Sequence, residues 1–291
     1  MGVLNLVEKV RQQAFEQPEK TAYYFLGKGT SYGELEQTIA RFAAALQDLG
    51  VQKGDHIALL LGNTPHYIIS LYASMRIGAV TIPINPIYTP DEISYIIKNG
   101  DVKVVIALDL LLPLVEAGVQ GFPQVTNYIV CETTPDVAEK YAALSDNAKT
   151  KTKLFTQVLK ETARTVDPVE VAPDDTAIIL YTSGTTGHPK GALLTHNNLY
   201  SNARDIGDYL KMTSEDRIIT TLPVFHVFAL TVVVNAPLTR GATILLAPRF
   251  SPAEIFDLAA TYKATVFAGV PTMFNFLYQY LRHSAQTLAV P

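Results

Sequence analysis

Short apolar segments that alternate with longer helical patterns are the feature that most constrains the fold of this chain. The apolar segments are rich in Val and Ile and have the length of buried strands, and helical patterns of about ten to twenty residues separate them. This alternation is typical of α/β proteins. The predicted strands are 21–26, 56–61, 79–84, 102–108, 127–130, 177–181, 217–221, 242–246 and 265–268. The predicted helices include 32–49, 65–77, 90–99, 196–210, 252–262 and 272–281.

The chain also repeats itself. Three landmarks recur at offsets of 161, 163 and 162 residues: Asp-x-Ile at 55 and 216, Gly-Ala at 78 and 241, and Pro-x-Glu-Ile at 90 and 252. Each landmark alone is common turn or helix-start chemistry, but the shared spacing favours two similar α/β lobes, each a sheet flanked by helices. We place the first lobe at 1–170, with a polar connector at 133–173, and the second at 171–291. A ligand is then expected in the crevice between the lobes, near strand ends and helix starts.

Composition excludes several classes of protein. The 291 residues include 23 Lys and Arg against 27 Asp and Glu, for a net charge of −4. Nucleic-acid binding needs a basic surface, so no nucleic-acid partner is expected. Cys131 is the only cysteine in the sequence, which excludes an internal disulfide and a cysteine-rich metal site. Since His56, His66 and His283 lack metal-ligand spacing, no metal held by side chains is predicted.

One stretch, 218–239, has 22 residues without a charge, which is the length of a membrane-spanning helix. It also contains Pro223, Pro237 and several polar side chains, so a buried strand, turn and helix explain it better. The N-terminal residues have helical apolar spacing but no apolar core of the kind found in a signal peptide. We therefore expect a cytoplasmic protein with an amphipathic N-terminal helix, and peripheral contact of that helix with a membrane is left open.

Residues 182–191 concentrate one kind of chemistry, with three glycines, three threonines, one serine and one lysine. Glycines let backbone N–H groups approach a ligand, the hydroxyl groups of Ser183, Thr185 and Thr186 are donors, and Lys190 adds a positive charge. This combination suits a polyphosphate. The spacing is not that of a Walker A loop, and Tyr181 occupies the first glycine position of a hydrolase nucleophile elbow. An ordinary flexible surface loop is the alternative.

The segment 181–191, YTSGTTGHPKG, resembles the phosphate-binding motif of the adenylate-forming superfamily, which includes acyl-CoA synthetases, luciferases and the adenylation domains of peptide synthetases. Further segments resemble other motifs of the same family: SYGEL at 31–35, RIGAVTIPINP at 76–86, LPVFH at 222–226 and GVPT at 269–272. The resemblance runs from about residue 21 to 281. It implies the fold of the N-terminal domain of an acyl-adenylate-forming enzyme, without the C-terminal part.

The resemblance also implies a reaction. In the family, a carboxylate attacks the α-phosphate of ATP to give an acyl-adenylate and pyrophosphate, and coenzyme A then displaces AMP to give a thioester. By resemblance, Lys190 and Thr186 are the expected catalytic residues. The expected nucleotide-binding residues are Thr182, Ser183, Gly184, Thr185, Thr186, Gly187 and Lys190. These donors would stabilise the charge that grows on pyrophosphate, with Mg²⁺ bridging phosphate oxygens.

The residue after Phe225 indicates the class of acid. Amino-acid-activating relatives carry an aspartate there, whereas this chain has His226, which would leave a buried substrate ammonium unpaired. The Phe-His pair resembles acyl-CoA and aryl-CoA synthetases, so a fatty acid is the expected substrate. A satisfied core histidine is the alternative for His226. Ala229 replaces a glycine of many relatives, which leaves the acyl chain length open. The expected acyl pocket comprises Phe225, His226, Gly269, Val270 and Pro271.

Other residues that the family uses have no recognisable counterpart before Pro291. They include an acid that holds magnesium, an aspartate on the ribose and a lysine on a mobile C-terminal domain. We therefore expect the N-terminal portion of a fatty acyl-CoA ligase that is not competent alone. The alternatives are a non-catalytic nucleotide- or acyl-binding module and an enzyme that adenylates aryl acids or amino acids.

Overall fold

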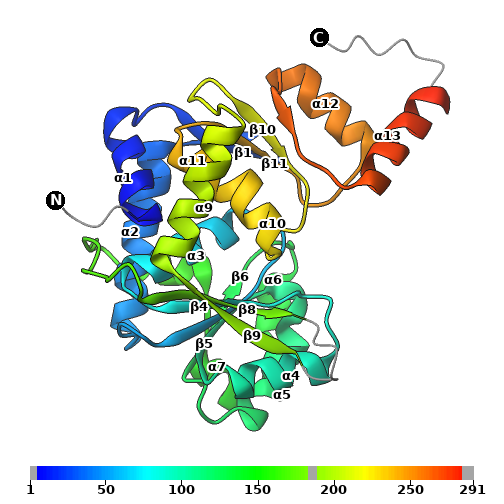
Figure 1. The fold of residues 1–291 in the computed structure, drawn as a ribbon. Coiled ribbons are helices and arrows are strands. Elements are labelled where there is room, and N and C mark those ends of the chain that lie inside the picture. Colours follow the sequence, from blue (N-terminus) through cyan, green and yellow to red (C-terminus); the bar gives the residue numbers. More distant parts are fainter. Residues whose placement is uncertain (1–4, 183–188, 284–291) are drawn as a thin grey trace. The chain divides into compact units, whose positions relative to one another are not determined.

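The computed structural model describes residues 5–182 and 189–283 and has two compact units, each built on its own sheet (Figure 1). Unit 1 is formed mainly by Gln37–Gly62 and His66–Asn198. Unit 2 is formed mainly by Glu8–Glu36, Asn63–Pro65 and 199–283. Among the described residues, four helices contribute to both units: α1 (Leu6–Glu16), α2 (Tyr32–Asp48), α3 (Pro65–Arg76, through Pro65 alone) and α9 (His196–Tyr209). The predicted α/β fold class is confirmed.

Unit 1 contains a seven-stranded sheet in the order β7-β6-β5-β3-β4-β8-β9. Neighbouring strands pair in parallel, except that β8 and β9 form an antiparallel hairpin. The strands are β3 (His56–Leu60), β4 (Val80–Pro83), β5 (Val102–Leu108), β6 (Asn127–Cys131), β7 (Thr152–Leu154), β8 (Thr176–Thr182) and β9 (Lys190–Thr195). The helices are α3 (Pro65–Arg76), α4 (Pro90–Asn99), the 3₁₀ turn η1 (Asp109–Leu111), α5 (Leu112–Gly121), α6 (Val137–Ala142), α7 (Asp146–Lys151) and α8 (Phe155–Glu161). Apolar side chains from this sheet and from α4 and α5 form one buried core.

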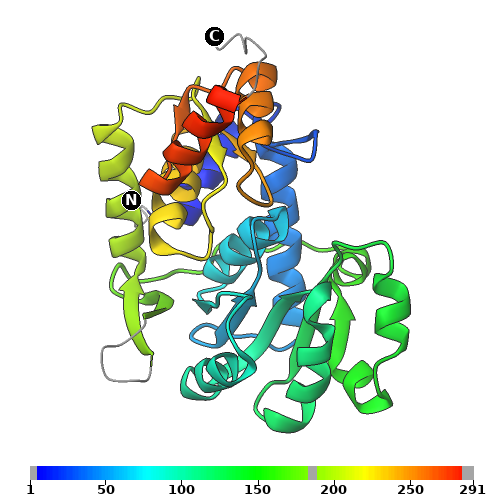
Figure 2. The same cartoon turned by 90° about the vertical axis from the view of Figure 1, so that its right-hand side faces the viewer.

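Unit 2 contains a five-stranded sheet in the order β12-β10-β11-β1-β2, in which only the β1–β2 pair is antiparallel. The strands are β1 (Thr21–Phe25), β2 (Lys28–Ser31), β10 (Arg217–Thr220), β11 (Thr243–Leu246) and β12 (Val266–Phe267). The helices are α10 (Val227–Ala229), the π-helix η2 (Leu230–Asn235), α11 (Ala236–Thr239), α12 (Pro252–Tyr262) and α13 (Pro271–His283). Helices α12 and α13, coloured orange and red, lie side by side (Figure 2).

The uncharged stretch 218–239 forms strand β10, a loop and the short helices α10, η2 and α11, which confirms the prediction of a strand, turn and helix. Across residues 5–182 and 189–283, no helix combines the length and apolar character needed to cross a membrane.

The two sheets share one topology. The order β5-β3-β4-β8-β9 in unit 1 corresponds to β12-β10-β11-β1-β2 in unit 2, with the same parallel and antiparallel pairs. The repeat seen in the sequence is therefore a repeat of structure. The two N-terminal hairpins are exchanged: β1–β2 precedes the first repeat but pairs with β11 of the second, and β8–β9 precedes the second repeat but pairs with β4 of the first.

Local details repeat as well. Gly78 and Gly241 enter strands β4 and β11 with φ angles of 70° and 72°, a conformation that glycine adopts without the steric cost of a side chain. The residues that follow them make the same backbone bond, from Ala79 N–H to Ser74 and from Ala242 N–H to Pro237, at 3.0 Å in both units. The repeated Gly-Ala pair is thus explained by a shared turn.

The hairpin exchange overturns the predicted division of the chain at residues 170 and 171. Strand β8 and the residues that form β9 were expected in the second lobe but belong to unit 1, and β1 was expected in the first lobe but belongs to unit 2. The predicted connector at 133–173 is also wrong. It folds into α6, α7, β7 and α8, and β7 pairs with β6 at the edge of the unit 1 sheet.

Candidate functional site

The hairpin β8–β9 carries the ends of the predicted phosphate loop. Thr182, the last residue of β8, pairs with Lys190, the first residue of β9, and both side chains are exposed. The predicted binding residues Ser183, Gly184, Thr185, Thr186 and Gly187 lie outside the described residues. The structure therefore brings together two of the predicted nucleotide-binding residues, at the carboxyl end of a parallel strand, where ligands bind in α/β sheets.

Contacts within unit 1 hold this hairpin in register. The hydroxyl group of Tyr181 donates to Asn99 Oδ1, at the end of α4, over 2.7 Å. Burial raises the pKa of Tyr181, and the neighbouring Tyr95 adds to this shift, so the hydroxyl keeps its proton at neutral pH. A Cβ atom at Gly191 would lie 2.8 Å from Ile179 Cγ2. Gly191 therefore lets β9 approach the side chains of β8 closely.

The predicted acyl-pocket residues lie in unit 2, in two segments that follow neighbouring parallel strands. Phe225 and His226 follow β10, and Gly269, Val270 and Pro271 follow β12. Because β10 and β12 pair in parallel, both segments leave the same edge of the sheet. The structure therefore brings these five residues to one edge.

His226 is exposed, so it is not a buried core histidine. Its Nδ1 atom accepts a hydrogen bond from the Phe228 N–H at 3.3 Å and caps α10, while its own backbone N–H donates to the Pro223 carbonyl at 3.0 Å. With Nδ1 used as an acceptor, the neutral ring carries its proton on Nε2.

Large apolar side chains near these segments are exposed. Val227 and Phe228 after β10 are 43% and 44% exposed, and Val270 and Phe274 after β12 are 40% and 49% exposed. The ring of Phe274 packs against Phe267 in an edge-to-face arrangement with centroids 5.4 Å apart. Apolar groups that stay exposed at the carboxyl edge of a sheet indicate a surface available to an apolar ligand.

Sequence analysis missed Asn63, which lies just after β3. Its side chain is 5% exposed and makes three hydrogen bonds to backbone groups: to the carbonyl groups of Leu222 and Ala247, and from the N–H of Val224. The signal that could have identified it is a polar residue that lies one glycine after the apolar strand 56–61 and precedes the helix that begins at Pro65.

His196 is the first residue of α9. Strand β9 runs from Lys190 to Thr195, and Thr195 pairs with Thr176 of β8. His196 therefore lies at the end of β9 that is farther from Lys190. It is 2% exposed, its backbone N–H donates to the Asp175 carbonyl, and its Nε2 has no hydrogen-bond partner among the described residues. Burial lowers the pKa of His196, and the charge of Asp175 opposes this shift only in part.

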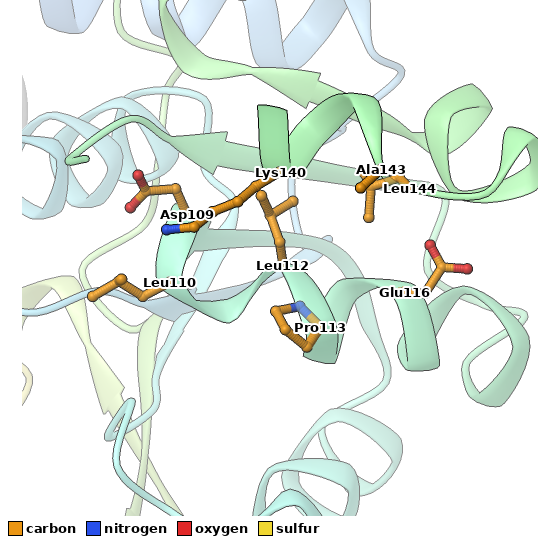
Figure 3. Close-up of a pocket in the computed structure, with 8 residues that line it drawn as sticks. All are labelled: Asp109, Leu110, Leu112, Pro113, Glu116, Lys140, Ala143 and Leu144. Carbon is orange, nitrogen blue, oxygen red and sulfur yellow. The ribbon is translucent and has the colours of Figure 1, made fainter. Parts of the chain in front are cut away.

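A cavity of about 350 Å³ lies on unit 1 (Figure 3), and none of the predicted site residues lines it. Apolar side chains of η1 and α5 form most of its wall. Its three charged side chains are already engaged. Lys140 pairs with Asp136 at 2.9 Å, Glu116 accepts from the Ser145 N–H at 3.0 Å, and Asp109 accepts from the Thr134 N–H at 2.8 Å. In the described part of the chain, no group of three or more His, Cys, Asp or Glu side chains is arranged to hold a metal ion.

Comparisons with known proteins agree with the motifs. The family model described as "AMP-binding enzyme" matches residues 10–289. The long-chain-fatty-acid–CoA ligase of Bacillus subtilis (strain 168) is 31% identical over 277 residues, which cover 88% of this chain and 48% of that protein. A feruloyl-CoA synthase of Amycolatopsis sp is 30% identical over 265 residues, which cover 89% of this chain and 47% of that protein.

Among solved structures, the inhibitor-bound N-terminal domain of FACL13 from Mycobacterium tuberculosis has a TM-score of 0.82 at 30% sequence identity. The match covers 95% of this chain and 65% of that one. The chain spans about half the length of the curated relatives it matches.

Proposed function

Because this chain belongs to the AMP-binding enzyme family, we propose that it is the N-terminal portion of a ligase that activates a fatty acid with ATP and transfers the acyl group to coenzyme A. The family membership supports adenylation of an acid, and the relative from Bacillus subtilis, named as a long-chain-fatty-acid–CoA ligase, supports the substrate class.

In this proposal, the hairpin β8–β9 binds the phosphates of ATP. Thr182 and Lys190 are exposed where the loop begins and ends, so a hydroxyl donor and an ammonium group are free to meet the nucleotide. The residues fit a polyphosphate, because short donors and a mobile cation complement its charge. A magnesium ion bound to the nucleotide would offset phosphate charge, and Lys190 would stabilise the charge that develops on the departing pyrophosphate.

One observation carries the choice of a fatty acid: large apolar side chains stay exposed beside His226. Val227 and Phe228, together with Val270 and Phe274, offer an apolar surface to an alkyl chain at the same edge of the sheet as His226. No aspartate follows Phe225, so this segment offers no carboxylate to the ammonium of an amino acid. An aryl acid is the second candidate, favoured by the 30% identity to a feruloyl-CoA synthase.

Since the chain spans about half the length of its curated relatives, we propose that it binds ATP and the acid, and that both adenylation and thioester formation use residues beyond these 291. Calorimetric titration of the chain tests binding. We expect heat of binding with ATP and with saturated fatty acids of increasing length, weaker binding of ferulate, and none of leucine. Binding of leucine without binding of fatty acid would overturn the substrate proposal. If the chain binds ATP or fatty acid and also catalyses acid-dependent ATP–pyrophosphate exchange by itself, the proposed need for further residues is overturned.

A further inference from the structure

The side chain of Asn63 connects three segments of unit 2. Its Nδ2 donates to the Leu222 carbonyl at 3.0 Å and to the Ala247 carbonyl at 3.1 Å, and its Oδ1 accepts from the Val224 N–H at 2.9 Å. An asparagine amide has two N–H donors and one acceptor oxygen. Both donors and the oxygen are thus used, and only this orientation of the amide satisfies all three backbone groups.

The backbone groups that Asn63 meets lie where two parallel strands have just ended. Leu222 and Val224 follow β10, and Ala247 directly follows β11. Beyond the end of a strand, a buried carbonyl or N–H no longer has a partner in the sheet and needs another one. Asn63 supplies that partner for all three groups, so a side chain without an amide would leave them unsatisfied.

We propose that Asn63 is the positioning residue for the segment 222–226, the loop that carries Phe225 and His226. The bond to Val224 fixes the backbone two residues before His226, and the bonds to Leu222 and Ala247 fix the start of that loop against the neighbouring one. The orientation of the His226 ring at the start of α10 follows from this backbone. The inference rests on the proposed function, in which Phe225 and His226 face the acid.

Hydrogen exchange of individual amides, measured by NMR on the 291-residue chain, tests the positioning itself. We expect Asn63→Leu to speed exchange at Val224 and Phe228 by about tenfold or more, since the variant loses all three side-chain hydrogen bonds that hold the loop. Thr239→Val is the matched control. It removes one buried side-chain bond in the same unit, from Thr239 Oγ1 to the Ala236 carbonyl at 2.9 Å, without touching the loop. Equal exchange at Val224 and Phe228 in the two variants would overturn the inference.

A second variant keeps the test decisive if Asn63→Leu does not fold. Asn63→Asp has the same size and keeps an oxygen that accepts from Val224, but it loses both donors. We expect exchange at Phe228 to be faster in Asn63→Asp than in Thr239→Val. Where Asn63→Leu folds, exchange at Val224 should also be slower in Asn63→Asp than in Asn63→Leu. If exchange at Phe228 is no faster in Asn63→Asp than in Thr239→Val, Asn63 does not position this loop.

Titration with a saturated fatty acid links the positioning to the proposed function. We expect Asn63→Leu to raise the dissociation constant by about tenfold or more and Thr239→Val to leave it unchanged. Equal affinities of Asn63→Leu and the parent chain would separate Asn63 from the acid site and overturn that part of the inference. If the parent chain binds no fatty acid, the proposed function fails by itself, and the exchange experiment alone decides the role of Asn63.

Discussion

Asp55 and Asp216 hold the same turn in the two units. Asp55 Oδ2 accepts from the Gln52 N–H at 2.6 Å, and Asp216 Oδ2 accepts from the Thr213 N–H at 2.7 Å. Each aspartate thus bonds the backbone three residues before itself, directly ahead of the equivalent strands β3 and β10. The two turns are therefore stabilised by the same local contact.

The two aspartates differ in the group that reaches them from the neighbouring strand. Lys103 of β5 pairs with Asp55 at 2.6 Å, whereas the Thr265 hydroxyl, just before β12, donates to Asp216 at 2.8 Å. The aspartate of unit 1 thus forms an ion pair with the neighbouring strand, whereas the aspartate of unit 2 accepts a hydrogen bond from a hydroxyl group.

The substitution Asp216→Asn should lower the free energy of unfolding by about 1–3 kcal/mol at neutral pH, because an amide has one acceptor oxygen for the three donors that Asp216 now serves, the Thr213 N–H and the hydroxyl groups of Thr213 and Thr265. Burial opposes ionisation of Asp216, but hydrogen bonds from Thr213 and Thr265 outweigh it and hold the pKa below its ordinary value. The stabilisation is therefore complete at neutral pH and is lost as the pH falls below about 4. Urea unfolding at two pH values measures both effects.

The control for this experiment is Asp205→Asn, which removes an exposed carboxylate that pairs with Arg204, its neighbour in the chain, at 2.8 Å. We expect a change within about 0.5 kcal/mol, as for other exposed ion pairs. Equal losses for Asp216→Asn and Asp205→Asn would contradict the role of the turn contact.

Unfolding should become easier as the pH falls from about 7.5 to 5.5. Burial lowers the pKa of His66 and of His196, and nearby carboxylates oppose this shift only in part. Both histidines therefore take up protons more readily in the unfolded chain, where the pKa is about 6.5, so stability is kept above that pH and declines below it. Each histidine contributes at most about 1.4 kcal/mol per pH unit.

The variants His66→Gln and His196→Gln should each flatten this pH dependence, as measured by urea unfolding at both pH values. His226→Gln, which changes an exposed histidine, should keep the slope of the parent chain. A double variant of His66 and His196 with an unchanged slope would show that other groups cause the acid sensitivity.

The substitution Gly191→Ala should destabilise the chain by about 1–3 kcal/mol, because the added methyl group would lie 2.8 Å from Ile179 Cγ2 and β9 must shift to admit it. Thermal unfolding measures the loss. At Gly121, the last residue of α5, an added methyl group meets no atom within 4 Å, so Gly121→Ala should cost nothing. If both variants unfold at the same temperature, close packing of β9 on β8 is not what requires a glycine at 191.

The substitution Lys190→Ala should weaken ATP binding by about tenfold or more and leave the free energy of unfolding unchanged. A charge-assisted hydrogen bond to phosphate is worth about 1.5–3 kcal/mol, whereas an exposed lysine contributes little to stability. Titration with ATP and urea unfolding give the two readouts. Lys160→Ala, at the end of α8, provides a control for loss of one positive charge. The same affinity for ATP in both variants would remove the role proposed for Lys190.

The order of strands and helices could be read from the sequence because it depends on local patterns. Every predicted strand and helix is present, since apolar runs and helical spacing lie within each element. Strands β2, β7 and β9 were missed. Strand β2 (KGTS) contains one glycine and no large apolar residue, β7 (TKL) has only three residues, and β9 begins Lys-Gly within the glycine-rich loop. The hairpin exchange could not be read either, because no local pattern says which of two similar sheets a hairpin joins.

For the candidate site too, the sequence predicted what depends on local motifs and not what depends on contacts between distant residues. Phe225 and His226 were identified by a motif within five consecutive residues, and the structure places them where a parallel strand ends. Asn63 was not identified, because its hydrogen-bond partners lie 159, 161 and 184 residues away in the chain. Its role depends on which strands end beside it, which only the fold reveals.

Because the hairpins are exchanged, strands that pair in the unit 2 sheet are translated far apart in time. Strand β1 leaves the ribosome early, but its parallel neighbour β11 is translated roughly 220 residues later, since Tyr23 pairs with Ile244. The nascent chain therefore carries one open strand edge while roughly 220 residues are translated, and such edges promote aggregation. Closing a contact of such long range is slow, so the second sheet should form last and depend most on protection during synthesis.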